Sequence, residues 1–396
     1  MIGNGEWIDA EDDVLSDAEP RRGQREEEPI FVPISCAELA AMEFDDKYLI
    51  ENMLAADTPT IVGAPLKCLK TMLSTEAAVC MATGLPFCGE WEVPEVKNVA
   101  FFCGEGGKRT LQDYAFRVTR SKDMRLETID RLHFFERVPQ FGNATHLVAL
   151  EKIIDHMGFE VAFIDPAYLA ITTERESSLF AQGALLRGVA ESCLGHGCTP
   201  ILLHHIKRSV ADPKNPPQLQ DLSWAGFAEF AGQWWLMSRR EEYNPMEPGS
   251  HRLWFNVGGR LGHGGLWGLD IEEGRKSDPG GRIWEVDIVP PEAARTEAQA
   301  AKETERRVRR EQQEQSDMIV VAMALRAFPE GATAGAVREK CSPKLSGARA
   351  RAALNQLVAT GNAEFCEVQV SNHKTPGKGY KPLATTGIYG EFADFQ

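Results

Sequence analysis

Residues 63 to 71 have the residue types that bind phosphate groups, and they follow an apolar run and precede helix-forming residues. Backbone N–H groups in a tight turn at a helix N-terminus attract phosphate oxygens. A lysine such as Lys70 can reach the β- and γ-phosphates, and the hydroxyl of Thr71 can bind Mg²⁺. We therefore interpret the stretch as a phosphate-binding loop for ATP and Mg²⁺, made of Gly63, Ala64, Pro65, Leu66, Lys67, Cys68, Leu69, Lys70 and Thr71.

The match to the pattern G-x-x-x-x-G-K-[ST] is imperfect. If Lys70 and Thr71 are its last two residues, Ala64 and Leu69 stand where the pattern has glycine, and Gly63 comes one residue too early. Glycine supplies backbone freedom that alanine and leucine lack. An ordinary turn between a strand and a helix, with a solvated lysine, is therefore the alternative interpretation.

Polar residues follow three further apolar runs, at Glu105, at Asp165 and at the pair His204 and His205. Asp165 can hold Mg²⁺, Glu105 can deprotonate an attacking water, and either histidine can form a hydrogen bond to the γ-phosphate. Each residue also has a plainer interpretation, as a helix cap, a solvated glutamate or a buried histidine. Ligands bind beyond the carboxyl ends of parallel strands, so we expect these residues to meet the loop there.

Apolar runs alternate with helix-forming stretches of 10 to 15 residues over much of the chain. This alternation predicts a mainly parallel sheet covered by helices on both faces. The expected strands are 98–103, 132–135, 161–165 and 200–205, and the expected helices are 72–83, 110–120, 145–157 and 179–193. A helix and a strand over 227–237, then a glycine-rich hairpin over 252–271, predict an antiparallel extension.

Arg239 and Arg240 close the strand before this hairpin. One of them could reach the γ-phosphate of a neighbouring subunit as an arginine finger. A surface ion pair with Glu241 or Glu242 is the alternative. The basic, proline-containing segment 207–217 could likewise face a central channel or form a plain surface loop.

The sequence of the C-terminal part predicts a charged helical linker followed by a small domain. Helices over 318–328, 333–341 and 346–360 precede a strand at 363–370, a pattern typical of a winged helix. Basic side chains on the third helix and in the expected wing could contact DNA, although Glu364 and Glu367 dilute the charge and also allow a protein partner. These basic residues are Arg349, Arg351, Lys374 and Lys378.

Composition and charge set broader limits. The 396 residues are 43% hydrophobic and 26% charged, and they carry a formal net charge of −15, which argues against a protein that coats nucleic acid. No apolar run approaches the roughly 18 to 20 residues of a membrane span, and no signal pattern opens the chain, so we expect a cytoplasmic protein. We interpret the nine cysteines as reduced thiols, including Cys193 and Cys198 on either side of His196.

Taken in order, the motifs around Thr71, Glu105, Asp165 and His204 resemble the RecA-like ATPases of the RepA and DnaB helicase group. The loop ending Leu-Lys-Thr resembles a bacterial AAA-family branch of that group. The resemblance covers residues 35–290 and implies Lys70 at the phosphates, Thr71 at Mg²⁺, Asp165 as the acid that holds Mg²⁺, Glu105 as catalytic base and the two histidines as sensor. Leu69 stands where the wider pattern has glycine, and it matches that branch. This departure bears on the rate of ATP hydrolysis more than on nucleotide binding.

The resemblance implies an α/β protein, with a RecA-like P-loop NTPase core that has a mainly parallel sheet and an antiparallel extension, plus a winged-helix-like C-terminal domain. The expected parts are an acidic tail (1–29) with ten acidic and three basic side chains, the core (30–290), the charged linker (291–316) and the C-terminal domain (317–396).

The first hypothesis is an Mg²⁺-dependent ATPase, of the helicase or remodeller type, that couples ATP to DNA. It would work as a homo-oligomer, a hexamer being one form, and would contact DNA through the C-terminal domain and core loops. A nucleotide-gated DNA-binding switch is the second hypothesis. A scaffold that binds nucleotide without turnover is the third, suggested by Ala64 and Leu69.

Overall fold

The computed structural model describes residues 32–43, 45–171, 179–207, 215–241, 243–369 and 376–383. The chain divides into two compact units, 1–46 and 47–396. The first unit contains helix α1 (Cys36–Ala41), which begins with a capping box between Ser35 and Glu38 and has no buried residue. The first strand of the structure begins after it, at Tyr48. The core boundary expected at residue 30 stays a prediction.

The second unit is built on a nine-stranded sheet in the order β11-β10-β9-β8-β3-β7-β6-β4-β5. The six strands from β8 to β5 in this order pair in parallel. They are β3 (Thr60–Ala64), β4 (Val99–Cys103), β5 (Leu132–Phe135), β6 (Val161–Asp165), β7 (Thr199–His205) and β8 (Gln233–Arg239). The expected mixed α/β fold with a mainly parallel sheet is confirmed.

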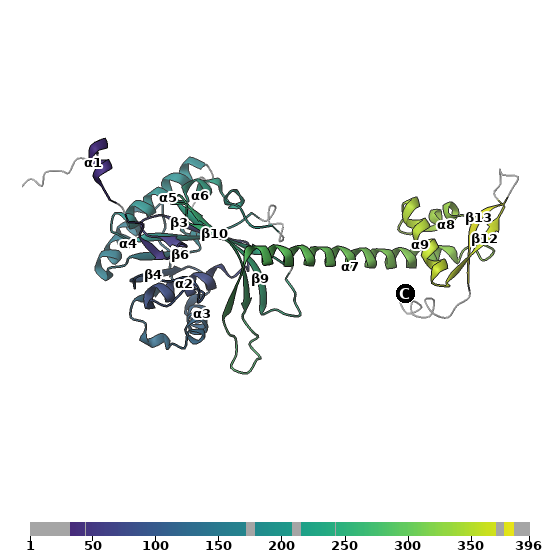
Figure 1. Cartoon of the computed structure of the whole chain (residues 1–396), viewed down its shortest axis with the longest axis horizontal. Helices are drawn as coiled ribbons and strands as arrows, with labels where there is room; N and C mark the ends of the chain where they lie inside the picture. The colour runs from purple at the N-terminus through teal and green to yellow at the C-terminus, as the bar shows by residue number, and fades with distance from the viewer. Residues whose placement is uncertain are drawn as a thin grey trace, which may run out of the picture. The chain divides into compact units, whose positions relative to one another are not determined.

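Helices cover both faces of the parallel strands, which is why those strands are apolar throughout. On one face the core contains Val62 and Phe101 and on the other Ile61 and Phe102, as strand alternation requires. The helices of the first face lie together in Figure 1, and so do those of the second. The first are α2 (Lys70–Thr83) and α3 (Gly107–Ser121), and the second are α4 (Ala144–Met157), α5 (Leu179–Leu194) and α6 (Ala225–Phe230).

The sheet continues beyond β8 as an antiparallel extension, as the sequence predicts. Gly258 pairs with Gly264, so the glycine-rich segment is largely part of the strands and only a short turn remains. A separate small hairpin lies at the start of the unit. The extension strands are β9 (Ser250–Gly259), β10 (Gly264–Glu272) and β11 (Glu285–Val289), and the small hairpin is β1 (Tyr48–Ile50) with β2 (Leu54–Ala55).

Short 3-10 turns connect several of these elements. They are η1 (Leu126–Thr128), η2 (Ala167–Ala170) and η4 (Leu219–Asp221).

Helix α7 (Pro291–Leu325) runs without a break across the boundary expected at residues 316 and 317. Its first turns are not fully solvated, because Ala294 and Ala298 are buried in a cluster with Trp254 of β9. Its last turns join the core of the C-terminal elements. Linker and first C-terminal helix are therefore one element, and the division into domains stays a prediction.

The C-terminal elements have the order that the sequence predicts. Thr333 and Ser346 cap the two helices through their side chains, and the two strands pair as an antiparallel hairpin. The winged-helix interpretation stays a prediction. The elements are α8 (Ala334–Lys340), α9 (Gly347–Ala359), β12 (Ala363–Val368) and β13 (Gly377–Pro382). Within the described ranges, no helix is both long enough and apolar enough to cross a membrane.

Strand β3 depends on Gly63, the first residue of the phosphate-binding loop. A Cβ at Gly63 would lie 2.6 Å from Leu222 Cδ2 and 2.7 Å from Leu236 Cδ2, and both leucines are fully buried. We expect Gly63→Ala to lower the free energy of unfolding by about 1–3 kcal/mol, the usual cost of overpacking. Chemical denaturation followed by circular dichroism measures this change.

Gly183→Ala is the matched control, because a Cβ at this helical position meets nothing within 4 Å. It should raise stability by about 0.5–1 kcal/mol, since alanine favours a helix more than glycine does. Equal denaturation midpoints for Gly63→Ala and the wild type would show that the two leucines move aside freely.

Candidate functional site

The loop between β3 and α2 adopts left-handed backbone conformations at two residues that are not glycine. Lys67 has φ +60° and Leu69 has φ +56°. Leu69 takes the glycine position of the sequence pattern and is also the N-cap of α2. Such a conformation costs a non-glycine residue about 1–2 kcal/mol. Ala64, at the other glycine position, ends strand β3 and needs no glycine freedom.

Three residues expected at the site converge where this loop meets strand β6. Lys70 Nζ lies 3.4 Å from Asp165 Oδ1, and Thr71 Oγ1 donates a hydrogen bond of 2.5 Å to Asp165 Oδ2. Lys70 is 9% exposed and Asp165 3% exposed. Strand β7 separates β3 from β6 in the sheet, so the contact crosses the carboxyl end of an intervening strand.

Glu105 follows strand β4 and is exposed. The phenol of Tyr168 donates a hydrogen bond of 2.5 Å to Glu105 Oε1. This hydrogen bond, together with burial, raises the pKa of Tyr168 to about 12. Tyr168 therefore holds one oxygen of the glutamate as a neutral donor at ordinary pH. Sequence reasoning did not identify Tyr168, although its position directly after β6 places it at the same sheet edge as Asp165.

The two histidines at the end of β7 have different environments. His204 stacks on Phe227 with ring centroids 3.8 Å apart, and its Nε2 lies 2.9 Å from the Ser223 carbonyl oxygen. Burial lowers the pKa of His204 to about 3. His205 is half-buried and lines the cavity beside the loop, and burial followed by the charge of Lys70 lowers its pKa. Of these two histidines, only His205 lines that cavity.

A cavity of about 620 Å³ lies over the loop. Its walls come from the loop, from α3 and from the antiparallel extension, so both halves of the sheet contribute to it. Sequence reasoning missed most of the residues outside the loop. The lining residues beyond 65–72 are Glu105, Tyr114, Arg117, His205, Arg239, Tyr243, Pro248, His251, Glu273 and Arg282.

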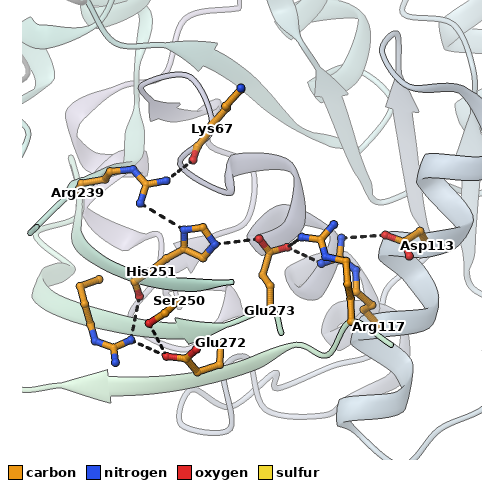
Figure 2. A network of polar contacts seen from close by, with 10 residues as sticks. Lys67, Asp113, Arg117, Arg239, Ser250, His251, Glu272 and Glu273 are labelled. Atoms are coloured by element: carbon orange, nitrogen blue, oxygen red, sulfur yellow. Dashed lines mark hydrogen bonds and ion pairs between the residues drawn. The ribbon is translucent and has the colours of Figure 1, made fainter. Parts of the chain in front are cut away.

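A network of polar contacts runs from the loop to helix α3 (Figure 2). Arg239 Nη2 donates to the Lys67 carbonyl oxygen at 2.9 Å, and Arg239 Nη1 lies 3.3 Å from His251 Nδ1. His251 Nε2 lies 3.0 Å from Glu273 Oε2, and Arg117 Nη1 of α3 donates to Glu273 Oε1 at 2.5 Å. The network thus connects three segments that are far apart in the sequence.

Glu273 is the carboxylate on which His251, Arg117 and Arg282 converge. Burial opposes ionisation of this carboxyl group, but hydrogen bonds from His251 and Arg117 and the charge of Arg282 outweigh burial and lower its pKa. An arginine can only donate and a carboxylate can only accept. His251 therefore accepts from Arg239 at Nδ1 and donates to Glu273 from Nε2, which assigns the neutral Nε2–H tautomer.

The structure corrects the expectation for Arg240. Its side chain is buried, with one guanidinium nitrogen bonded to Asp270 and Nη1 2.7 Å from Glu297 Oε2. A buried and paired guanidinium cannot extend to a neighbouring subunit, so Arg240 does not fit an arginine finger. Its partners also differ from the expected Glu241 and Glu242, of which Glu242 lies outside the described residues. Arg239 contacts the loop of its own chain.

The donor set at Asp165 fits Mg²⁺. Mg²⁺ prefers oxygen ligands, usually one or two carboxylates with waters and substrate phosphates. The hydroxyl of Thr71 and the carboxylate of Asp165 supply such oxygens within hydrogen-bond distance of each other. Within the described part of the chain, no group of three or more His, Cys, Asp or Glu residues could hold a metal ion on protein ligands alone. Cys193 and Cys198 are buried thiols.

The expected DNA-contacting residues of the C-terminal part are only partly available. Arg349 forms two hydrogen bonds to Asp317, at 2.7 and 2.6 Å, which join α9 to α7. Arg351 is exposed, and Lys378 Nζ lies 3.6 Å from the centroid of the Phe365 ring. Lys374 lies outside the described residues, as do residues 208–214 of the expected channel loop.

Residues 35–210 match the family model described as an AAA domain. No curated protein matches the chain. Many solved structures resemble it, and two of them are described here. The KaiC-like protein PH0186 from the hyperthermophilic archaeon Pyrococcus horikoshii OT3 has a TM-score of 0.41 and 16% identity, over 61% of this chain and 94% of that one. The RadB recombinase has a TM-score of 0.38 and 15% identity, over 55% and 88% respectively.

The family match spans the loop and the strands that carry Glu105, Asp165, His204 and His205. It supports an ATP-binding P-loop domain in this range. The two structural likenesses are too low to carry an argument about function.

The buried imidazole of His204 makes the stability of the fold depend on pH. In the unfolded chain it takes up a proton below about pH 6.5, whereas in the folded protein its pKa is about 3. The unfolded state therefore binds more protons between these values, and stability falls as the pH decreases. His204→Gln should remove about 1.6 kcal/mol of the decrease in unfolding free energy between pH 6.5 and 5. Urea unfolding at both pH values measures it.

His156→Gln, at an exposed histidine of α4, controls for the loss of an imidazole. The interpretation fails if His204→Gln and the wild type lose the same free energy of unfolding over this pH range.

Proposed function

We propose that the chain binds ATP with Mg²⁺ in the cavity over the phosphate-binding loop and hydrolyses it. The observation that carries this proposal is the convergence of Lys70, Thr71 and Asp165 at the loop. A lysine, a hydroxyl and a carboxylate at the start of a helix match what Mg²⁺-bound phosphates require. The AAA-domain match over residues 35–210 supports the same assignment.

Each residue has a role that follows from its position. The loop N–H groups and Lys70 bind the phosphates, while Thr71 and Asp165 would hold Mg²⁺. The ion, when bound, neutralises charge on the β- and γ-phosphates. Glu105 accepts a proton from the attacking water, and the phenol of Tyr168 fixes its orientation. His205, at the cavity, is better placed than His204 to form a hydrogen bond to the γ-phosphate.

Coupling to DNA is the second part of the proposal. The exposed Arg351 and Lys378, on α9 and β13, support a contact to phosphates. A helicase or remodeller, acting as a homo-oligomer in the cytoplasm, remains our first hypothesis. A nucleotide-gated DNA-binding switch is the alternative. Stimulation of ATP hydrolysis by DNA distinguishes a motor from that switch.

Two variants should separate nucleotide binding from hydrolysis. Lys70→Ala removes a charged donor and should weaken ATP binding at least about tenfold, because a hydrogen bond to a charged group contributes about 1.5–3 kcal/mol. Glu105→Gln should retain ATP binding while turnover falls about 10²- to 10⁴-fold, the usual contribution of a general base. Equilibrium binding of a fluorescent ATP analogue and steady-state phosphate release measure the two effects.

Lys97→Ala controls for the removal of a lysine, since Lys97 pairs with Glu95 and Glu160 at the amino-terminal end of β4. Wild-type turnover in Lys70→Ala would exclude the loop as the ATP site. Loss of binding in Glu105→Gln, with normal turnover per bound ATP, would exclude Glu105 as the base.

The DNA contact predicts a change in salt dependence. Replacing Arg351 and Lys378 by glutamine should weaken binding to duplex or single-stranded DNA and reduce the slope of log affinity against log salt by about 1 for each lost phosphate contact. Fluorescence anisotropy over a salt series measures it, with Lys152→Gln at an exposed position of α4 as control. An unchanged slope would contradict the DNA contact and would favour a protein partner for the C-terminal elements.

A further inference from the structure

The phosphate-binding loop has a backbone conformation that its residues do not favour on their own. Lys67 and Leu69 both have positive φ values. Leu69 is constrained from two sides, because its side chain packs against the main core and its carbonyl oxygen accepts the Leu73 N–H of α2 at 2.9 Å. The side chain of Lys67 is exposed. Unfavourable conformations persist only where the surrounding structure enforces them, so the constraint on Lys67 must act on its backbone.

That constraint comes from Arg239. Its Nη2 donates to the Lys67 carbonyl oxygen at 2.9 Å, directly at the left-handed residue. Arg239 is the last residue of β8, the strand that pairs with β3 on the side away from β7. The loop is thereby tied to the strand next to the one from which it emerges.

Arg239 is itself held in place. Its guanidinium lies 5.1 Å from the centroid of the Tyr243 ring, and its Nη1 contacts His251. His251 is 5% exposed and fixed by Glu273, which is 4% exposed and paired with Arg117 and Arg282. Buried polar groups that form hydrogen bonds to one another in this way restrict each other's motion. The loop carbonyl is therefore connected to a constrained chain of side chains that ends on α3 (Figure 2).

We propose that Arg239, oriented by His251 and Glu273, is a positioning residue that holds the phosphate-binding loop in its nucleotide-binding conformation within the same chain. The hydrogen bond to Lys67 takes the place of the backbone freedom that glycine would give. This inference rests on the proposed ATP site and replaces the arginine-finger expectation for Arg239. It differs from direct contact with the nucleotide, because Arg239 acts through the loop backbone.

A rescue experiment in the full-length protein tests the proposal. Glycine at position 67 adopts a positive φ without strain, so it should make the arginine unnecessary. We expect Arg239→Ala to weaken binding of a fluorescent ATP analogue with Mg²⁺ by about 5- to 15-fold, the equivalent of one hydrogen bond. In the double variant Lys67→Gly with Arg239→Ala, affinity should return to within about threefold of Lys67→Gly alone.

The control double variant is Lys67→Ala with Arg239→Ala, which removes the same lysine charge but keeps a Cβ at position 67. It should bind as weakly as Arg239→Ala. His251→Phe should also weaken ATP binding, because Arg239 loses its hydrogen-bond partner. His251→Gln should keep much of the wild-type affinity, since an amide can both accept from Arg239 and donate to Glu273. At saturating ATP, turnover of Arg239→Ala should stay within about threefold of wild type, whereas KM rises.

Three outcomes would overturn the proposal. If Arg239→Ala has the same effect in the Lys67→Gly background as in the wild type, the arginine contacts the nucleotide directly. If affinity is unchanged and turnover is lost, the arginine acts on catalysis. If affinity and turnover are both unchanged, it has no role at the site. Wild-type protein that fails to bind ATP, or binds it independently of Lys70, would instead refute the ATP site itself.

Discussion

The contact of Asp165 with Lys70 and Thr71 is the interaction on which the site depends. Lys70 and Asp165 are almost completely buried, and a buried charge left without its partner destabilises a protein by about 3–5 kcal/mol. The carboxylate at the end of β6 and the lysine at the start of α2 therefore need each other. They meet only because β7 lies between β3 and β6 and all three strands are parallel, so that their carboxyl ends share one edge.

The antiparallel extension contributes to the same site from the opposite side. Arg239 ends β8, His251 lies in β9 and Glu273 follows β10, so three successive elements of the extension bring polar groups to the cavity. The loop is thus held from two directions, at its helix by Asp165 and at its backbone by Arg239. Strands β8 to β10 therefore contribute to the proposed nucleotide site as well as to an edge of the sheet.

The sequence predicted the elements that depend on local patterns, and it missed contacts that depend on the fold. The order of strands and helices followed from apolar runs and turn residues, and the end of each parallel strand indicated Glu105 and Asp165. Tyr168 was missed because a single tyrosine after a proline carries no periodic signal. The contact between Lys67 and Arg239 joins residues 172 apart, which no local pattern can reveal.

His204 and His205 show the limit of such patterns most clearly. The sequence indicated both as candidates for a hydrogen bond to the γ-phosphate, whereas adjacent residues of a strand point to opposite faces. The packing of Phe227 against His204 decides which of the two lies at the cavity, and Phe227 lies further along the chain in helix α6, which no local pattern around the histidines indicates.

The departures from the glycine pattern bear on binding and hydrolysis in different ways. Ala64 lies in a strand and needs no glycine, and Leu69 keeps a left-handed conformation under the constraint of the core. A loop already held in one conformation loses less entropy when a ligand binds, so such constraint favours affinity. The proposed base Glu105 lies after β4, on a separate segment that Tyr168 orients. A scaffold without turnover would therefore be expected to lack the carboxylate at 105, and the glycine substitutions alone are a weak argument for it.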